Sequence, residues 1–275
     1  MSAAALVILA GVALAGIAFL VWWLVFESEG VYLGRRAVIW LYELYAWRYD
    51  RIKAFTPEYD HLLLAQPIMG AIAPHRAPMV LDVATGTGRL PDAVLNHTLF
   101  QGRVIGVDAS RRMLVKAAAK LAADGDRVTL VWADALDLPF LDESFDVVTC
   151  LEALEFMPDQ MRALDELLRV LRPGGLLLIT QRINTRWMPG RLHDGAALET
   201  LLTARGAESV TLEPWQEDYN RVWARKQGMA PAIGARPVAE ILRCPDGGRL
   251  DAVGQCDGAE VPIADDGVIE WLRLK

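Results

Sequence analysis

The sequence predicts an α/β fold: a doubly wound sheet of seven mostly parallel strands, the last of them antiparallel, with a transmembrane helix before it and a small β-rich ribbon after it. Three observations support this prediction. Short apolar runs alternate with segments of helical pattern from residue 79 onward, a glycine turn follows the first run, and residues 3–26 carry no charge. The alternation indicates parallel strands joined by right-handed crossovers.

The expected strands are short apolar runs, each followed by a turn or by a helical segment. They are Met79–Val83, Arg103–Val107, Val128–Trp132, Phe145–Cys150, Gly175–Thr180, Ser209–Glu213 and Tyr219–Lys226. The expected helices among them are Arg111–Ala123, Gln160–Leu171 and Ala196–Arg205. The connection between the last two strands is too short for a parallel crossover, so it predicts an antiparallel hairpin.

The chain divides into four expected parts. They are an anchor over 1–30, a helical cover over 31–78, the sheet domain over 79–227 and a small module over 237–275, with a Gly/Pro/Ala linker at Gly228–Arg236. Within the cover, Val31–Ala73 is expected to be helical, and its aromatic residues are expected to pack into the core. These residues are Trp40, Tyr42, Tyr45, Trp47 and Tyr49.

The uncharged segment Ala3–Phe26 is long enough to cross a membrane. As a helix it would extend about 36 Å, which exceeds a hydrocarbon core. Trp22 and Trp23 lie near its end, where an interfacial aromatic belt is found. A cleaved signal peptide is the alternative, but a basic n-region and a clear cleavage site are missing. Basic residues follow the segment and none precedes it, so we expect a single-pass protein with the body of the chain on the cytoplasmic side. These basic residues are Arg35, Arg36, Arg48, Arg51 and Lys53.

Composition limits the classes of partner. The 275 residues are 53% hydrophobic and carry a net charge of −7. No basic stripe is available for phosphate contacts, which argues against a nucleic-acid binder. The three cysteines, Cys150, Cys244 and Cys256, are too few for a secreted disulfide scaffold, so we expect reduced thiols. No particular oligomeric state is predicted.

The stretch Val80–Leu90, VLDVATGTGRL, predicts a nucleotide cradle. Its apolar start is typical of a buried parallel strand. Gly86 and Gly88 then allow a sharp turn and a close approach of the backbone to a ligand at a helix N-terminus. In a dinucleotide-binding GxGxxG turn the third glycine would occupy position 91, which is Pro91 in this chain.

Acidic residues at the ends of the first three strands indicate what the cradle holds. Asp82 could accept a hydrogen bond from a ligand ammonium, and Asp108 could hold both hydroxyls of a ribose. Asp134 could accept a hydrogen bond from an adenine amine. The carboxyl ends of parallel strands meet at one edge of a sheet, so these acids are expected to line one crevice. A crevice lined by acidic residues favours a cationic ligand that carries no phosphate.

Over residues 49–226 these motifs resemble, in order and spacing, those of the class I S-adenosylmethionine-dependent methyltransferases (type 11-like). VLDVATGTGRL resembles the first motif, with Ala84 in place of its usual first glycine, and VIGVDAS resembles the ribose-binding motif. LPF…SFD and LLRVLRPGGLLLIT resemble later motifs. The resemblance implies a Rossmann-like fold with a reversed seventh strand, and S-adenosyl-L-methionine as methyl donor. The implied cofactor-binding residues are Asp82, Ala84, Thr85, Gly86, Gly88, Asp108, Ala109, Met113, Asp134, Ala135 and Leu151.

Methyl transfer from a sulfonium is an in-line displacement that positioning and desolvation can drive without a metal. A general base is needed only where the nucleophile must lose a proton early. The candidate bases are Glu152 and Glu155 after the fourth strand and His193 in the loop Arg182–Gly195. For Glu155 the alternative is a carboxylate that stabilises a helix start. The resemblance implies that the loop shapes the acceptor pocket, and three of its residues could meet an anionic headgroup: Arg182, Arg186 and Arg191.

We expect a small, lipophilic acceptor, such as a lipid or a quinone, because the anchor would place the enzyme at a bilayer. Two alternatives stay open. One is a non-catalytic scaffold that keeps the cofactor site and presents the C-terminal module to a partner. The other is a nicotinamide-dependent dehydrogenase, which Pro91 and the reversed final strand disfavour.

Residues Ala239–Leu272 resemble the small zinc-ribbon-like module of the Trm112 type. Cys244 and Cys256 match the first cysteine of each of its two pairs, whereas Gly247 and Ala259 occupy the second positions. A structural zinc site uses four ligands. We therefore expect a degenerate ribbon without metal that depends on packing against the main domain, and a zinc ion shared between two subunits is the alternative.

Overall fold

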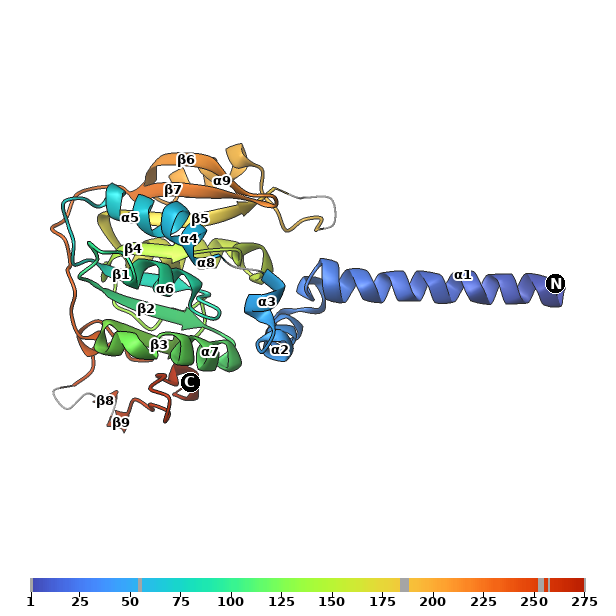
Figure 1. Cartoon of the computed structure of the whole chain (residues 1–275), viewed down its shortest axis with the longest axis horizontal. Helices are drawn as coiled ribbons and strands as arrows, with labels where there is room; N and C mark the ends of the chain where they lie inside the picture. Colours follow the sequence, from blue (N-terminus) through green and yellow to red (C-terminus); the bar gives the residue numbers. More distant parts are fainter. Residues whose placement is uncertain (1, 54–55, 184–187, 252–254, 257, 275) are drawn as a thin grey trace.

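One seven-stranded sheet with the strand order β3-β2-β1-β4-β5-β7-β6 organises the chain (Figure 1). This computed structural model describes residues 2–53, 56–183, 188–251, 255–256 and 258–274. The strands are β1 Met79–Val83, β2 Arg103–Asp108, β3 Val128–Trp132, β4 Phe145–Cys150, β5 Leu171–Arg182, β6 Ala207–Gln216 and β7 Tyr219–Lys226. The strands β1 to β5 pair in parallel, and β7 runs antiparallel to both β5 and β6. The predicted fold class is confirmed.

Helices cover both faces of the sheet. On one face, α8 and α9 contribute Leu164 and Leu198 to a core that includes Leu81. On the other face, α6 and α7 contribute Leu90 and Leu114 to a second core. The bounds are α6 Arg89–Leu95, α7 Arg111–Lys120, α8 Gln160–Val170 and α9 Gly195–Thr203, with short 3₁₀ turns at Ala122–Arg127 and Leu154–Phe156. Because both faces are covered, all five residues of β1 are buried.

The cover is helical, as expected, but it is broken into short pieces. Gly30 and Gly34 adopt φ values of 75° and 90°, which interrupt the helix before α2. Its pieces are a 3₁₀ turn Val31–Leu33, α2 Arg35–Tyr45, α3 Tyr49–Lys53, α4 Pro57–Asp60, a π-helical turn His61–Ala65 and α5 Gln66–Ala71. The long helix α1 Ala3–Trp22 and a π-helical turn Trp23–Glu27 precede the cover. Trp40 and Trp47 are 62% and 60% exposed. The expectation that the aromatic residues pack into the core is therefore wrong for these two.

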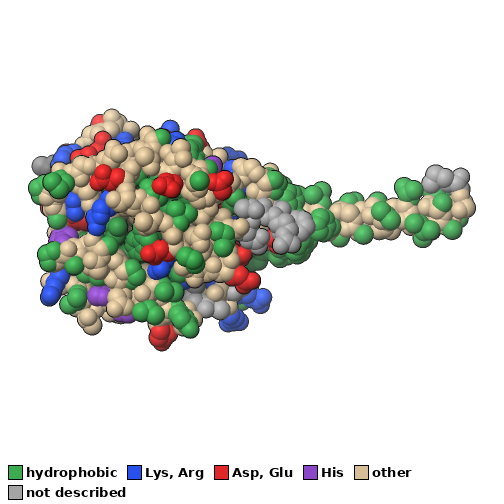
Figure 2. Space-filling model, turned by 90° about the horizontal axis from the view of Figure 1, so that it is seen from above, with side chains coloured by type: hydrophobic (Ala, Val, Ile, Leu, Met, Phe, Trp, Pro, Cys, Tyr) green, Lys and Arg blue, Asp and Glu red, His purple; other side chains and the backbone are tan. Residues whose placement is uncertain are grey.

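The N-terminal helix projects away from the domain (Figure 1), and hydrophobic side chains follow it along its length (Figure 2). The most apolar stretch of the span Ala3–Glu27 has a mean hydropathy of 2.8, and none of that stretch is buried. By length and composition it can cross a membrane, a test that a leader sequence also passes. The absence of burial distinguishes it from a core helix, which would pack its apolar side chains against the domain.

The C-terminal module extends the edge of the sheet beside β3. The Trp132 amide donates to the Ile269 carbonyl at 2.8 Å, and the Ile269 amide donates to the Leu130 carbonyl at 2.9 Å. Trp271 is 1% exposed and belongs to the main core. The module also contains the two-stranded sheet β8 Gln255–Cys256 and β9 Ala259–Glu260 and 3₁₀ turns at Val238–Glu240 and Trp271–Arg273. Its attachment satisfies backbone groups that an open edge strand would expose.

The two cysteines of the module are oxidised, contrary to the expectation from the sequence. Cys244 and Cys256 form a disulfide, whereas Cys150 is free and buried in β4. The expectation of reduced thiols is therefore wrong for the pair. The turn after Cys244 and the β8–β9 hairpin bring the two Cα atoms within 5.4 Å, a separation that a disulfide spans. Within the described ranges, no group of three or more His, Cys, Asp or Glu side chains is arranged to hold a metal ion.

Candidate active site

The turn after β1 contains three residues in the left-handed backbone region. Ala84, Gly86 and Gly88 have φ values of 58°, 56° and 81°. The Gly86 amide donates to Oδ2 of Asp108 at 2.8 Å, which ties the turn to the end of β2. A Cβ at Gly88 would lie 3.0 Å from Cδ1 of Leu121, so this glycine permits close packing between the start of α6 and the end of α7.

Asp82, in β1, is a buried carboxylate beneath this turn. It is 3% exposed, and the Thr149 hydroxyl donates to its Oδ1 at 2.7 Å. Burial raises the pKa of Asp82 to about 7, and the hydrogen bond from Thr149 only partly offsets this shift. A positive ligand group beside Asp82 would favour the charged carboxylate.

Asp108 lies at the end of β2 with both carboxylate oxygens engaged. Its Oδ2 accepts from Gly86, and its Oδ1 accepts from the Ser110 amide at 2.7 Å. Burial raises the pKa of Asp108 to about 6, against the opposing effect of these backbone donors. Each oxygen keeps a further lone pair for a ligand hydroxyl.

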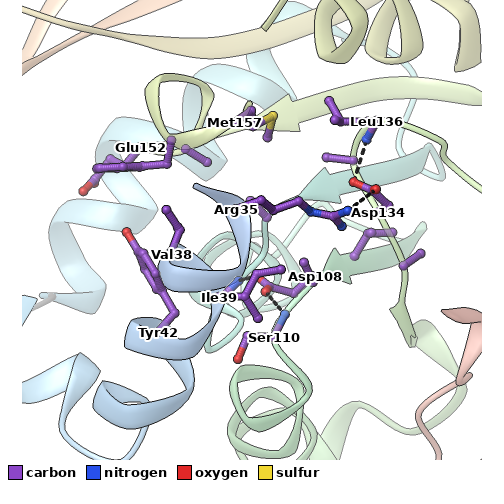
Figure 3. Close-up of a pocket in the computed structure, with 18 of the residues that line it drawn as sticks. Arg35, Val38, Ile39, Tyr42, Asp108, Ser110, Asp134, Leu136, Glu152 and Met157 are labelled. Atoms are coloured by element: carbon purple, nitrogen blue, oxygen red, sulfur yellow. Dashed lines mark hydrogen bonds and ion pairs between the residues drawn. The ribbon is translucent and has the colours of Figure 1, made fainter. Parts of the chain in front are cut away.

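Asp134, after β3, is held by a residue from the cover (Figure 3). Its Oδ2 lies 2.8 Å from Nη1 of Arg35, and its Oδ1 accepts from the Leu136 amide at 3.0 Å. The two charged side chains are 37% and 19% exposed, for Arg35 and Asp134 respectively. Arg35 therefore occupies a hydrogen-bonding position that the sequence resemblance assigns to a ligand.

One cavity joins the ends of β1, β2, β3 and β4, and a smaller cavity adjoins it beneath the glycine turn. Of the predicted cofactor residues, the larger cavity is lined by Ala84, Gly86, Asp108, Ala109, Asp134, Ala135 and Leu151. Asp82 and Thr85 line the smaller one. Gly88 and Met113 line neither: Gly88 shapes the turn, and Met113 is 1% exposed within the packed side of α7. The structure thus brings nine of the eleven predicted residues to two adjoining cavities.

The cover contributes one wall of the larger cavity, which no motif in the sequence predicts. α2 places Arg35, Val38, Ile39 and Tyr42 on the larger cavity (Figure 3). Tyr49, at the start of α3, also lines it. The first four are spaced i, i+3, i+4 and i+7, which is one face of a helix. That spacing was visible in the sequence, but nothing in it indicated that this face covers the glycine turn.

Glu152 occupies the boundary between the two cavities and lines both of them. Its backbone has a φ of 50°, and its amide donates to the Thr180 hydroxyl at 2.7 Å. Its carboxylate pairs with Arg89 at 2.7 Å and with Lys53 at 3.2 Å. Of the three candidate bases, Glu152 is the one that lines the larger cavity.

Glu155 and His193 lie at a separate small cavity next to β5. Glu155 is 3% exposed, accepts a hydrogen bond from the Tyr219 hydroxyl, and has a pKa that burial raises. Nε2 of His193 lies 2.9 Å from Oε1 of Gln160. The structure does not bring either side chain to the main cavity.

Two of the three arginines predicted to meet a headgroup, Arg182 and Arg191, contact other parts of the protein. Nε of Arg191 donates to the Glu155 carbonyl at 3.1 Å, and the guanidinium of Arg182 lies 5.9 Å from the centre of the Phe156 ring. Both cations therefore face protein groups near the small cavity. Arg186 lies outside the described residues.

Comparison with known proteins identifies related sequences for the sheet domain. Residues 81–179 match the family model described as a methyltransferase domain. Demethylmenaquinone methyltransferase of Clavibacter sepedonicus is 39% identical over 48% of this chain and 53% of its own length. The enzyme of that name from Staphylococcus aureus (strain MRSA252) is 36% identical over 48% of this chain and 54% of its own length. The chain thus spans about half the length of these curated relatives.

Solved structures share the fold at lower identity. A chain of the complex that contains the Haloferax volcanii Trm112 methyltransferase activator superposes with a TM-score of 0.55 at 20% identity, over 68% of this chain and 98% of that chain. A SAM-dependent methyltransferase from Aquifex aeolicus superposes with a TM-score of 0.50 at 19% identity, over 62% and 98%. The segment from β1 to β5 therefore matches a methyltransferase domain in sequence, and the sheet around it has the fold of such enzymes.

Proposed function

We propose that this chain is an S-adenosyl-L-methionine-dependent methyltransferase, anchored to a membrane by α1, that transfers a methyl group to a small lipophilic acceptor. The observation that carries the proposal is the convergence of Asp82, Asp108 and Asp134 at adjoining cavities around the Gly86 turn. The match of residues 81–179 to a methyltransferase domain supports the same activity.

The donor set fits this cofactor. In the proposed arrangement Asp108 accepts hydrogen bonds from the ribose hydroxyls. Asp134 and Ala135 face the adenine, and Asp82 faces the methionine portion. Asp82 is buried and Asp108 is partly buried, and both have raised pKa values, so a nearby sulfonium and ammonium would stabilise their charged forms. The cofactor supplies a methyl group already activated by the positive sulfur.

The chain's own contribution to the reaction is positioning and exclusion of water. The cover closes over the site with Tyr42 and Tyr49, and the backbone at Gly86 allows close approach of the ligand. If the acceptor must lose a proton, we propose Glu152 for that role because it lines the cavity. Glu155 and His193 would then have a structural role beside the site. Glu155 accepts a hydrogen bond from Tyr219, and His193 is hydrogen-bonded to Gln160.

The character of the cavity wall supports a lipophilic acceptor. Besides its polar residues, the larger cavity is lined by the apolar side chains of Val38, Ile39, Phe156, Met157 and Pro158. The matched relatives are named demethylmenaquinone methyltransferases. We propose a lipid or a quinone-like molecule as the acceptor.

Two observations bear on the side of the membrane. The cluster of basic residues after α1 supports the cytoplasmic side, which we propose. The Cys244–Cys256 disulfide favours an oxidising compartment. Labelling of intact cells with a maleimide, before and after reduction, distinguishes the cytoplasmic side from an oxidising compartment. Labelling of Cys244 and Cys256 by an impermeant reagent in intact cells would contradict the cytoplasmic assignment.

We propose that the C-terminal module is a metal-free, Trm112-like ribbon that stabilises the domain in cis by extending the sheet beside β3. Its bonds through Ile269 and its buried Trp271 support this role. The module is thereby attached to the sheet that carries the site, which favours an enzyme over a scaffold that presents the module to a partner.

Calorimetric titration with S-adenosylmethionine tests the activity class. We expect binding by the intact chain and strong loss of affinity in Asp108→Ala. Asp126→Ala is the control, since this side chain is 86% exposed and pairs only with Arg103 among the ion pairs of the described residues. Absent binding, or binding that Asp108→Ala leaves unchanged, would refute the proposed cofactor site.

Incubation of membranes and soluble extracts with a cofactor labelled at the methyl group tests the acceptor class. We expect lipid-extractable label in the membrane fraction that requires the intact enzyme. Label confined to the soluble fraction would contradict the lipophilic acceptor, and binding of the cofactor without any transfer would favour the scaffold.

A further inference from the structure

Helix α2 has two different faces. Its inner face, Arg35, Val38, Ile39 and Tyr42, lines the larger cavity (Figure 3). Glu43 fixes the helix to the domain, because its Oε1 accepts from the Ser110 hydroxyl at 2.8 Å and from the Arg112 amide at 3.0 Å. The opposite side of α2 is therefore held in a defined orientation.

The outer face of α2, which we define as Arg36, Trp40, Leu44 and Trp47, is exposed along its length. Trp40 is 62% exposed, Leu44 is 44% exposed and Trp47, just after the helix, is 60% exposed. Arg36 is exposed beside them, and the guanidinium of Arg48 lies 3.9 Å from the centre of the Trp47 ring. Two exposed tryptophans with flanking arginines form an aromatic and cationic surface.

This surface is continuous with the helix that can span a membrane. α2 begins shortly after the span Ala3–Glu27 ends, and Figure 1 shows it at the end of the domain from which α1 emerges. Side chains hold the junction: the ring of Trp23 stacks on Tyr32 with centroids 4.9 Å apart, and the Tyr42 hydroxyl donates to Oε2 of Glu29 at 2.6 Å. Helix α2, which carries the outer face, is thus tied to the boundary of the span.

We propose that the outer face of α2 lies in the headgroup region of the bilayer that α1 crosses. Tryptophan favours this depth because its ring is apolar and its N–H is polar, and arginines favour anionic headgroups. The inference rests on the membrane anchor proposed above. Its consequence is that one helix contacts lipid on one side and lines the cavity on the other. An acceptor dissolved in the bilayer would then reach the site beside α2 without crossing bulk water.

Spin-label accessibility in the full-length chain tests the proposal. The chain is reconstituted into vesicles of zwitterionic and anionic phospholipid, with one nitroxide attached at Leu44→Cys. Leu99→Cys is a matched control, because both leucines are 44% exposed. Leu99 precedes β2, so it lies near the amino ends of the parallel strands, whereas the cavity that α2 covers lies at their carboxyl ends. Leu14→Cys, within α1, reports insertion of the anchor. The native cysteines do not compete, since Cys150 is buried and the other two are bonded.

We expect the ratio of oxygen to nickel-chelate accessibility at position 44 to be several-fold higher than at position 99 and to approach the value at position 14. Adding Trp40→Ser and Trp47→Ser should lower the ratio at position 44 without changing it at position 14, and S-adenosylhomocysteine affinity should stay constant as a check of folding. A lipid-buried label at position 14 with equal ratios at 44 and 99 would overturn the outer-face contact and leave the anchor intact. A water-exposed label at position 14 would overturn both.

Discussion

Lowering the pH from about 8 to about 5 is expected to weaken binding of S-adenosylhomocysteine through Asp108. Hydrogen bonds from ribose hydroxyls favour the carboxylate, so the ligand binds the ionised form and lowers the pKa of this group. Burial places the pKa of Asp108 at about 6 in the free protein. One unit below that value only about one molecule in eleven is ionised, so the dissociation constant should rise roughly tenfold.

The sign of this effect separates it from a loss of fold. The pKa of Asp108 is higher in the folded chain than the ordinary 3.8. Its contribution to folding stability is therefore greatest at low pH and declines as the pH rises from 3.8 towards 6. Weaker binding in acid thus cannot result from the effect of this group on folding, because that effect has the opposite sign.

Calorimetric titration across this pH range, with Asp108→Asn and Asp126→Asn, is the assay. Asp108→Asn removes charge-assisted hydrogen bonds worth about 2 kcal/mol, so affinity should fall roughly thirtyfold. The step near pH 6 should disappear in this variant and persist in Asp126→Asn. A further step near pH 7 belongs to Asp82 and should remain. Affinity that is flat down to pH 5 in the native chain, or an unchanged step in Asp108→Asn, would refute the reasoning.

Three further predictions concern other parts of the site and the module. Arg35→Met should tighten S-adenosylhomocysteine binding by up to about fivefold, because the partly exposed pair with Asp134 is worth at most about 1 kcal/mol; weaker binding in titration would mean that Arg35 contributes to ligand contact instead. Ala84→Gly should stabilise the chain by roughly 0.5–1 kcal/mol in denaturant unfolding, because alanine at a φ of 58° costs more than the added chain entropy of glycine. A loss of stability would contradict this account. Cys244→Ser should destabilise the module by about 3 kcal/mol, as expected from a sequence separation of 12. Thermal unfolding that is insensitive to reductant in the native chain would show that the bond makes no such contribution.

Local sequence determined most of the sheet domain. Apolar runs such as Met79–Val83 coincide with strands because a strand buried on both faces needs continuous apolar residues. The short link before Tyr219 required an antiparallel hairpin, which β6 and β7 form. Asp108 ends β2 and Asp134 follows β3, so parallel pairing alone places the two acids at the carboxyl ends of neighbouring strands.

Contacts between distant segments could not be predicted in the same way. Glu155 follows β4 as expected, yet its carboxylate faces Tyr219 of β7 and not the main cavity. The direction of a side chain after a strand depends on the backbone of the turn: Glu152, with a φ of 50°, is the residue that reaches the cavity. The disulfide likewise depends on how the turn after Cys244 folds onto the β8–β9 hairpin.

Local sequence patterns predict the succession of strands along the sheet domain, the glycine turn with its three acids, and an uncharged helix that can span a membrane. Each of these is encoded over a few neighbouring residues by periodicity, turn chemistry or length. In contrast, the closure of the cavity by α2, the pair between Arg35 and Asp134 and the extension of the sheet edge by Ile269 are visible only in the folded chain. Those contacts join residues far apart in the chain, and their free energy comes from packing and desolvation that no local pattern records.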